Sequence, residues 1–383
     1  MSRGVQTTHS ARLMYAASET HADMLYATRL MVPDPFLWMS VEEKQYIVVS
    51  QLEVGRALKE VPPGIEVVSW QQARERWCVA STGERGPETL IAAVTRQFNI
   101  DQWKVPADFP LGLARSLEEH DVHLEPTTPF FPSRQHKNRR EIQEIREGVA
   151  LAEIGMEHAL TILREARVVA NGNLSWRGTP LTAEILRGEI DAEIARHGGT
   201  ASHTIAAPGP QSADPHQCGH GRMRAREPIV IDIFPRVDRS GYHGDLTRTV
   251  VKGDPSETVS RAFTAVHDAR EKAIAAARPG VAAAHVHAVA AKELADHGFE
   301  TDTHHVPPRG FIHATGHGLG LEVHEPPRAS ETSEAILEDG HVITIEPGLY
   351  YPEWGGVRLE DVIVIQEDGC ENLTSIATVV QVD

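Results

Sequence analysis

The sequence contains little cysteine and no long hydrophobic run. Its three cysteines, Cys78, Cys218 and Cys370, lie far apart among 383 residues and form no CxxC pair. These positions argue against a disulfide framework or a thiolate zinc site, and they suit a reducing compartment. No apolar run approaches the roughly 20 residues of a membrane span, and Arg3 and Glu19 interrupt any signal-peptide core. We therefore expect a cytoplasmic protein.

Positive charge is also scarce. Lys and Arg number 37 against 54 Asp and Glu, so the formal net charge is −17 with His neutral. A negative field of this size repels phosphate backbones and anionic lipid, and we expect neither nucleic acid nor a membrane as a partner. Hydrophobic residues make up 41% and charged residues 24% of the chain, which is typical of a globular protein. The length predicts two domains.

Residues 1–135 alternate short apolar runs with helical patterns. This alternation predicts a small α/β domain. We find no catalytic constellation in it and expect a structural or oligomer-forming role. The predicted strands are 46–50, 66–68 and 78–80, and the predicted helices are 52–60 and 90–98.

A polar stretch over residues 132–140 separates this part from a second domain, which we expect over residues 136–383. Its patterns predict helices with β segments between them, and these segments are rich in Val and Ile. The predicted helices are 141–166, 182–197, 257–277 and 283–297. The predicted strands are 229–234, 246–251, 341–345 and 362–365.

Two pairs of acidic residues recur at nearly matching intervals in this second part. Asp245 follows Asp232 by 13 positions, and Glu360 follows Glu346 by 14 positions. Each pair has the form of two strands joined by a loop, so a hairpin would turn both carboxylates toward one pocket. Burying four negative charges together is unfavourable unless cations neutralise them. The pattern therefore predicts divalent metal ions.

A glycine-rich segment over residues 313–327 carries three histidines, His313, His317 and His324. Glycine lets a backbone approach a site closely, which favours a ligand-holding segment over an ordinary strand, and the glycines argue against a helix. Histidine is the commonest neutral metal ligand and also a proton shuttle near neutral pH. The segment joins the acidic pairs as a candidate part of the same site.

Four blocks of the sequence resemble the signature blocks of the M24 peptidases: IVIDIF…GYHGDLTRTV, HATGHGLGLEVHEPP, ITIEPGLYY and GGVRLEDVIVI. This family comprises Xaa-Pro dipeptidases (prolidases), Xaa-Pro aminopeptidases and methionine aminopeptidases, with creatinase as a metal-free relative. The resemblance covers about residues 138–383, and the N-terminal part is similar to the smaller domain of prolidases and creatinase. It implies an α/β N-terminal domain followed by an α+β pita-bread catalytic domain, and a homodimer formed through the N-terminal domain.

The resemblance also implies five metal-ligand positions, of which Asp245 and Glu360 match those that bridge both metals. The five residues are Asp232, Asp245, His317, Glu346 and Glu360. The first two ligands are commonly eleven positions apart in the family, and here they are 13 apart. We expect the extra residues to lengthen the loop over residues 235–244 without disturbing the ligands.

Further roles follow from the same resemblance. His324 matches the histidine that contacts the scissile carbonyl, where it would hydrogen-bond the developing oxyanion, and Glu346 is the candidate for moving the water proton to the leaving nitrogen. His216, His313 and Arg358 match positions that line the substrate pocket.

The implied activity is hydrolysis of Xaa-Pro peptide bonds by a metal-bridging hydroxide, for which two divalent ions lie about 3.5–4 Å apart. Four carboxylates and one imidazole favour Mn²⁺ and leave Zn²⁺, Co²⁺ and Fe²⁺ open. We expect small substrates with proline at the second position. Xaa-Pro dipeptides are favoured because Arg358 and His216 can meet a free carboxylate.

Other functions stay open. An Xaa-Pro aminopeptidase would act on longer peptides, and a metal-free M24-like binding module would have lost ligands. A creatinase-type enzyme lacks this complete ligand set. Methionine aminopeptidases typically lack the domain of about 135 residues that here precedes the catalytic part.

Overall fold

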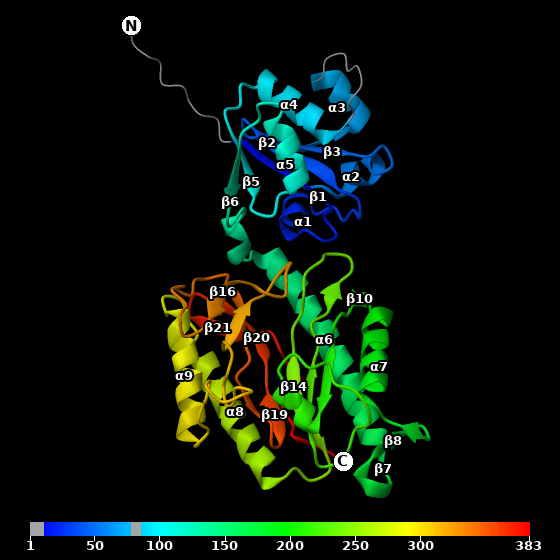
Figure 1. Ribbon diagram of the computed structural model, residues 1–383, viewed down its shortest axis with the longest axis vertical. Coiled ribbons are helices and arrows are strands. Elements are labelled where there is room, and N and C mark those ends of the chain that lie inside the picture. Colours follow the sequence, from blue (N-terminus) through cyan, green and yellow to red (C-terminus); the bar gives the residue numbers. More distant parts are fainter. Residues whose placement is uncertain (1–10, 78–85) are drawn as a thin grey trace. The chain divides into compact units, whose positions relative to one another are not determined.

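The computed structural model describes residues 11–77 and 86–383, so the strand predicted at 78–80 lies outside the described residues (Figure 1). The chain divides into two compact units, and the first ends at Pro132 where the second begins at Ser133. The proposed division into folding domains at residue 135 stays a prediction. Among the described residues, no helix combines the length and the apolar character needed to span a membrane.

The first unit is built on a six-stranded sheet with helices on both faces. Its strands are β1 (Ala11–Ala16), β2 (Phe36–Val41), β3 (Lys44–Val49), β4 (Ile65–Ser69), β5 (Trp103–Pro106) and β6 (Leu124–Thr127). Its helices are α1 (Ala22–Thr28), α2 (Val54–Glu60), α3 (Trp70–Trp77), α4 (Pro87–Gln97) and α5 (Leu111–Glu118). The strand order is β4-β3-β2-β1-β5-β6, and only β2 runs antiparallel to its neighbours.

The two faces of this sheet bury separate cores. In β2, Leu37 and Met39 join one core with residues of α3, α4 and α5, whereas Phe36 and Trp38 join the other core with residues of α1 and α2. Successive side chains of a strand point to opposite faces, so a strand covered on both sides is a continuous apolar run. The predicted α/β character of this part is confirmed.

The second unit contains four long helices and a set of short 3-10 turns. The helices are α6 (Arg139–Glu165), α7 (Ala183–Arg196), α8 (Glu257–Ala276) and α9 (Ala283–Asp296). The predicted helices agree with these to within two residues at each end. Helix α6 begins earlier than predicted because Asn138 and Glu141 form a capping box that satisfies the first backbone amides.

Most strands of the second unit form two separate sheets. The first contains β11 (Ile205–Pro208), β12 (Pro228–Asp232), β14 (Thr247–Lys252) and β22 (Gln381–Val382), in the order β11-β12-β14-β22. The second contains β15 (Gly316–Gly318), β16 (Glu325–Ala329), β17 (Val342–Ile345), β20 (Asp361–Gln366) and β21 (Gly369–Asn372), in the order β16-β15-β17-β20-β21.

Each of these sheets packs against one pair of helices. Helices α6 and α7 share a core with β11, β12 and β14, and helices α8 and α9 share a second core with β17 and β20. The strand pairs that carry the acidic residues are antiparallel in both halves, as predicted.

The loops between these strands are more ordered than the sequence predicted. A short strand, β13 (Arg236–Val237), lies between β12 and β14 and pairs with β10 (Gly199–Thr200). A hairpin of β18 (Gly348–Tyr351) and β19 (Gly355–Arg358) lies between β17 and β20. The remaining strands, β7 (Arg167–Val168), β8 (Leu174–Trp176) and β9 (Thr179–Pro180), form a small sheet of their own.

Candidate metal centre

The first acidic pair lies at one end of the β12–β14 ladder. Asp232 is the last residue of β12 and lies opposite Thr247, the first residue of β14. Asp245 comes two positions before Thr247 and is buried, with 3% of its surface exposed. The chain before it crosses α6 so closely that a Cβ atom on Gly244 would lie 2.0 Å from the carbonyl carbon of Gly148. Only glycine fits at this crossing, which fixes the path into Asp245.

The second acidic pair is aligned in the same way. Ile345 of β17 lies opposite Asp361 of β20, so Glu346 and Glu360 are the next residues along the two strands and are neighbours. The backbone amide of Glu360 donates to the carbonyl oxygen of Thr247 at 3.0 Å, and its carboxylate accepts from the Thr247 hydroxyl at 2.8 Å. These bonds join the two sheets and bring both acidic pairs together.

His317 lies in the middle of β15, where the glycines on both sides are required by space. A Cβ atom on Gly316 would lie 1.8 Å from the carbonyl oxygen of Thr344, and one on Gly318 would lie 2.4 Å from that of Pro326. The pairing of β15 with β16 shifts register between His317 and Gly318. The glycine-rich segment is therefore a strand packed tightly between two others, with a register shift at His317. Such irregularities are common next to active sites.

The imidazole of His317 reaches both acidic pairs. Its Nε2 atom lies 3.2 Å from Oε1 of Glu346 and 3.8 Å from Oδ2 of Asp245. Its Nδ1 atom lies 3.2 Å from the carbonyl oxygen of Gly318, which can only accept a hydrogen bond. Donation from Nδ1 leaves Nε2 as the ring nitrogen that faces the carboxylates and that would bind a metal ion once deprotonated.

The buried carboxylates repel one another. Burial raises the pKa of Asp245 well above its usual value, and the charge of Asp232 raises it further. The pKa of Glu360 is likewise raised well above its usual value by burial and then by the charge of Asp245. Carboxylates in this position either hold protons or require cations beside them.

The pair of His317 and Glu346 behaves in the opposite way. Burial opposes both charges, but the hydrogen bond to Glu346 and its charge raise the pKa of His317 to about 9. Burial is also outweighed at Glu346, where the hydrogen bond and charge of His317 lower the pKa to about 2. In the metal-free protein the imidazolium therefore occupies part of the space that a cation would take.

The donor set fits divalent metal ions. One ligand atom each from Asp245, His317 and Glu360 lies within 4.8 Å of the others. Within residues 11–77 and 86–383, Oδ1 of Asp232 is buried and has no hydrogen-bond partner. A buried carboxylate oxygen without a donor is expensive, and a cation would satisfy it. Asp232, Asp245, His317, Glu346 and Glu360 are thus all gathered at one place.

A tyrosine that the sequence analysis did not single out connects the predicted pocket residues. The hydroxyl of Tyr350 is fully buried and lies 2.8 Å from Nε2 of His313 and 2.9 Å from Nη1 of Arg358. Nη2 of Arg358 donates to Oδ2 of Asp232 at 2.7 Å. The chain His313–Tyr350–Arg358–Asp232 links the pocket wall to the metal centre. Its signal in the sequence was the aromatic pair directly after the glutamate block, ITIEPGLYY.

The two other predicted histidines border the same region. The ring of His324 lies at 87° to that of His317, with 4.3 Å between their centroids. Burial and then the neighbouring charge of His317 lower the pKa of His324, which favours its neutral form. His216 is exposed and follows Pro215, whose carbonyl oxygen accepts from Arg358 at 3.3 Å.

The residue after His324 is held by two cations. Glu325 is buried and accepts from the Lys137 ammonium at 2.6 Å and from Nη2 of Arg134 at 2.7 Å. Lys137 is itself buried, and a Cβ atom on Gly320 would lie 2.5 Å from the Glu325 carboxylate. The chain on either side of His324 is thereby fixed, and this clamp was not predicted from the sequence.

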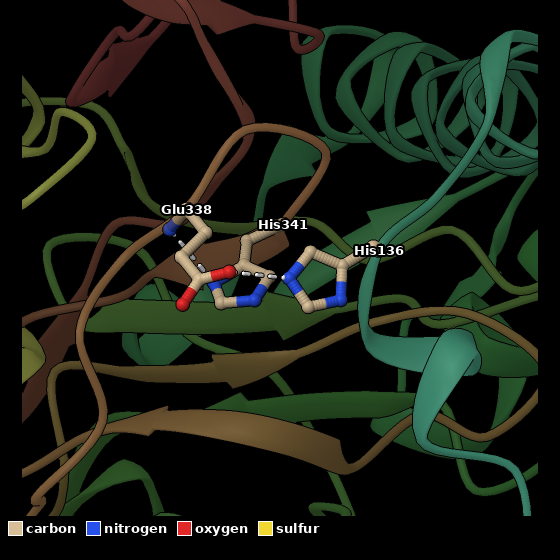
Figure 2. Close-up of side chains that lie close together, drawn as sticks. All are labelled: His136, Glu338 and His341. Carbon is tan, nitrogen blue, oxygen red and sulfur yellow. Dashed lines mark hydrogen bonds and ion pairs between the residues drawn. The ribbon is translucent and has the colours of Figure 1, made fainter.

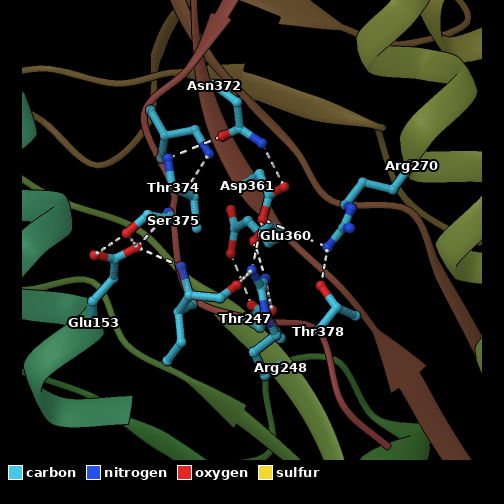
Figure 3. Close-up of polar contacts among 12 residues, drawn as sticks. Glu153, Thr247, Arg248, Arg270, Glu360, Asp361, Asn372, Thr374, Ser375 and Thr378 are labelled. Carbon is cyan, nitrogen blue, oxygen red and sulfur yellow. Dashed lines mark hydrogen bonds and ion pairs between the residues drawn. The ribbon is translucent and has the colours of Figure 1, made fainter. Parts of the chain in front are cut away.

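A second charged network lies directly behind Glu360 (Figure 3). Nη1 of Arg248 donates to the Glu360 carbonyl at 2.6 Å, and Nη2 donates to Oδ1 of Asp361 at 2.8 Å and to the Ile376 carbonyl at 3.1 Å. Arg270 approaches the same Asp361 oxygen at 3.5 Å. The buried acid of this network is therefore neutralised by the protein itself.

The sequence is similar to that of known peptidases. The family model described as metallopeptidase family M24 matches residues 143–367. An Xaa-Pro dipeptidase of Pyrococcus furiosus is 39% identical over 175 residues, which are 45% of this chain and 47% of that protein. An uncharacterized peptidase of Bacillus subtilis is 34% identical over 241 residues, 62% of each protein. The chain thus aligns with about half the length of the Xaa-Pro dipeptidase.

Solved structures resemble nearly the full length of this chain. The prolidase from Pyrococcus horikoshii superposes with a TM-score of 0.78 at 25% identity and covers 97% of this chain and 96% of its own. The X-Pro aminopeptidase from Thermotoga maritima has a TM-score of 0.81 at 22% identity, with 97% of both chains covered. These likenesses confirm the predicted α/β domain followed by a pita-bread domain. Because the family model matches more than half of its residues, the chain belongs to metallopeptidase family M24.

Proposed function

We propose that this protein hydrolyses the peptide bond before proline in Xaa-Pro dipeptides. The observation that carries the proposal is the convergence of Asp245, His317 and Glu360, with Glu346 bonded to His317. Oδ1 of Asp232 is also buried and lacks a hydrogen-bond donor among the described residues. The Xaa-Pro dipeptidase of Pyrococcus furiosus, 39% identical over the aligned residues, supports the same substrate class. Two divalent ions would be held by Asp232, Asp245, His317, Glu346 and Glu360.

Bound ions of this kind would polarise the scissile carbonyl and lower the pKa of the attacking water. The set of ligands is rich in oxygen, and this supports Mn²⁺ as the physiological metal. Metal binding would displace the proton of His317 and release Glu346 from its ion pair. The freed Glu346 carboxylate would then accept the proton of the water and pass it to the leaving nitrogen of proline.

His324 would stabilise the oxyanion that forms on the scissile carbonyl. Its lowered pKa keeps the imidazole neutral near pH 7, so one ring nitrogen is available as a hydrogen-bond donor to the developing charge. The clamp of Lys137 and Arg134 on Glu325 holds the adjacent backbone and limits the positions that His324 can take.

Arg358 is better placed to orient Asp232 than to meet substrate directly. Its guanidinium distributes its donors among Asp232, Tyr350, Thr247 and the carbonyl oxygen of Pro215. We therefore propose that Arg358 and Tyr350 hold Asp232 and the pocket histidine His313 in place. The exposed imidazole of His216 is then the group that meets the free carboxylate of proline.

A panel of peptides tests the proposal directly. Purified protein with Mn²⁺ should cleave Xaa-Pro dipeptides, leave matched Xaa-Ala dipeptides intact and lose activity on chelation. His324→Ala should lower kcat by about 10²–10³-fold while metal content stays the same, because it removes one oxyanion donor. Faster cleavage of Xaa-Pro tripeptides than of matched dipeptides would instead favour an aminopeptidase. Full activity in a metal-stripped sample would contradict the proposal.

Two further properties belong to the same proposal. We propose a cytoplasmic homodimer formed through the N-terminal part, with the catalytic domain over residues 136–383. The N-terminal unit carries no group resembling the metal centre in its described residues, which leaves assembly as its best-supported role. Light scattering at micromolar concentration should report a dimer, and a monomer would contradict it.

A further inference from the structure

A second group of metal-ligand side chains lies outside the carboxylate centre. It consists of His136, just before α6, and of Glu338 and His341, just before β17 (Figure 2). One nitrogen of each imidazole and one oxygen of the carboxylate lie within 4.8 Å of one another. Nε2 of His136 is 2.8 Å from Oε2 of Glu338, and the two rings lie side by side with 4.6 Å between their centroids.

The buried histidine of this group has an unused ring nitrogen. His341 is 3% exposed, and within the described part of the chain its Nε2 atom has no hydrogen-bond partner. Its Nδ1 atom accepts from the backbone amide of Glu338 at 3.2 Å. A buried polar atom without a partner is rare in proteins and indicates a missing water, ion or ligand.

A similar group of metal-ligand side chains on α8 and α9 already has a cation of the protein beside its carboxylate. Asp268, Glu293 and His297 also present ligand atoms within 4.8 Å of one another. There, however, the ammonium of Lys272 pairs with the Glu293 carboxylate and supplies the positive charge. At Glu338 no Lys or Arg of the described residues does the same. Lys137, which follows His136 in the sequence, forms its ion pair with Glu325 and not with Glu338.

We propose that His136, Glu338 and His341 form a second metal site, which takes a borderline divalent cation such as Zn²⁺. Two imidazole nitrogens and one carboxylate oxygen form a ligand set that suits Zn²⁺, with water in the fourth position. This set differs from the oxygen-rich catalytic centre, so the two sites should prefer different metals. The exposed side chains of His136 and Glu338 leave a path for the ion to enter.

The charge state of His341 agrees with this assignment, although its ring proton lies on Nε2 in the metal-free protein because Nδ1 accepts from the Glu338 amide. Burial, followed by the charges of His136 and Lys137, lowers the pKa of His341 to about 4, so its imidazole is neutral at neutral pH. Ligation through Nε2 moves the ring proton to Nδ1 and gives up the long contact with the Glu338 amide. The ion would strengthen a connection that already exists, because the amide of Lys137 donates to the carbonyl oxygen of Gly340 at 2.8 Å.

The test is metal stoichiometry in the full-length protein. Metal-stripped wild type, His136→Ala and His297→Ala are dialysed against Zn²⁺ and analysed for bound metal. His136→Ala should hold one equivalent fewer than wild type, whereas His297→Ala, the matched control, should hold the same number. His136 is half exposed, so its variant should keep the wild-type circular dichroism spectrum.

A variant background separates this site from the catalytic one. Glu360→Gln weakens the carboxylate centre, and adding His136→Ala to it should still remove one equivalent of Zn²⁺. Peptidase activity with Mn²⁺ should be unchanged in His136→Ala alone, so failure of the proposed reaction and failure of this site are distinguishable. Equal zinc content in wild type and His136→Ala, or an equal loss in His297→Ala, would overturn the site.

Discussion

Glu360 and Asp361 are neighbours in the sequence, and both are buried, yet the surroundings of their carboxylates differ in charge (Figure 3). Asp361 points away from the metal centre and meets Arg248 at 2.8 Å, Arg270 at 3.5 Å and the side-chain amide of Asn372 at 2.8 Å. Among the described residues, the carboxylate of Glu360 accepts a hydrogen bond from the Thr247 hydroxyl alone, and it lies among other carboxylates.

This difference in surroundings marks Asp361 as a structural charge and Glu360 as a functional one. A buried acid that the fold neutralises with its own cations contributes to the folded state, provided that no partner is removed. A buried acid left among like charges destabilises the metal-free fold and gains its counter-charge only from outside the chain. Two adjacent positions can serve both purposes because successive side chains of a strand point to opposite sides.

Loss of a functional carboxylate should have the largest effect. Glu360→Gln removes a ligand from the centre, and loss of about 4 kcal/mol of metal-assisted stabilisation would lower kcat/KM by about a thousandfold. Steady-state hydrolysis of an Xaa-Pro dipeptide measures this. Glu367→Gln, an exposed acid nearby in sequence, is the control and should keep wild-type activity. Similar activity in both variants would remove Glu360 from the centre.

Loss of the structural acid should instead show in stability. Asp361→Asn leaves the buried Arg248 without its counter-charge, whereas Arg270 keeps Glu271 as a partner, and the change should destabilise the protein by about 3 kcal/mol. The change is read from the midpoint of denaturant unfolding at constant slope. Asp368→Asn, on the exposed turn after β20, should change little. An unchanged midpoint for Asp361→Asn would contradict the comparison.

The affinity for metal should rise with pH. With a pKa raised to about 9, His317 holds a proton at pH 7 in the metal-free protein, and a metal ion must displace it. Each proton displaced makes the affinity increase about tenfold per pH unit, until the pH passes about 9. Calorimetric titration in two buffers of different ionisation enthalpy counts the released protons. Affinity that is constant between pH 6 and pH 8 would contradict this assignment.

The smallest expected effect is an increase in the stability of the metal-free protein. Asp245→Asn mimics the protonated carboxyl, and in metal-free protein at pH 7 it should stabilise the fold by about 1 kcal/mol. The folded-state pKa of Asp245 is raised, so the wild-type carboxyl favours folding below its unfolded pKa of about 4 and loses that contribution as pH rises. The difference in melting temperature should therefore shrink toward pH 4. A destabilised metal-free variant would show that the repulsion is absent.

Much of this arrangement could be predicted from the sequence, because it depends on local patterns. The acidic pairs at the ends of apolar runs predicted both antiparallel ladders, and helical periodicity located α6 to α9 to within two residues. The family resemblance then named the residues that meet at the centre. These signals lie within short segments, where spacing and residue type carry the information.

Other features depend on contacts between distant segments and leave no local pattern. Nothing near Glu325 indicates that Lys137, 188 positions earlier, neutralises it. Tyr350 looks like an ordinary apolar strand residue until its hydroxyl is seen between His313 and Arg358. The short strand β13 was missed because its partner, β10, is too far away in the sequence to suggest a hairpin.

The network behind Glu360 also has a consequence for how the protein is made in the cell. Arg248 and Arg270 obtain partners from Ile376 and Thr378, and β22 pairs with β14 near the end of the chain. A ribosome therefore exposes both arginines long before it synthesises Ile376 and Thr378, although Arg270 can pair with the adjacent Glu271 at once. The described sheet of the first unit uses strands from residues 11–127 alone, so we expect it to form during translation, whereas we expect the second unit to complete its interior only after residues 376–382 have emerged.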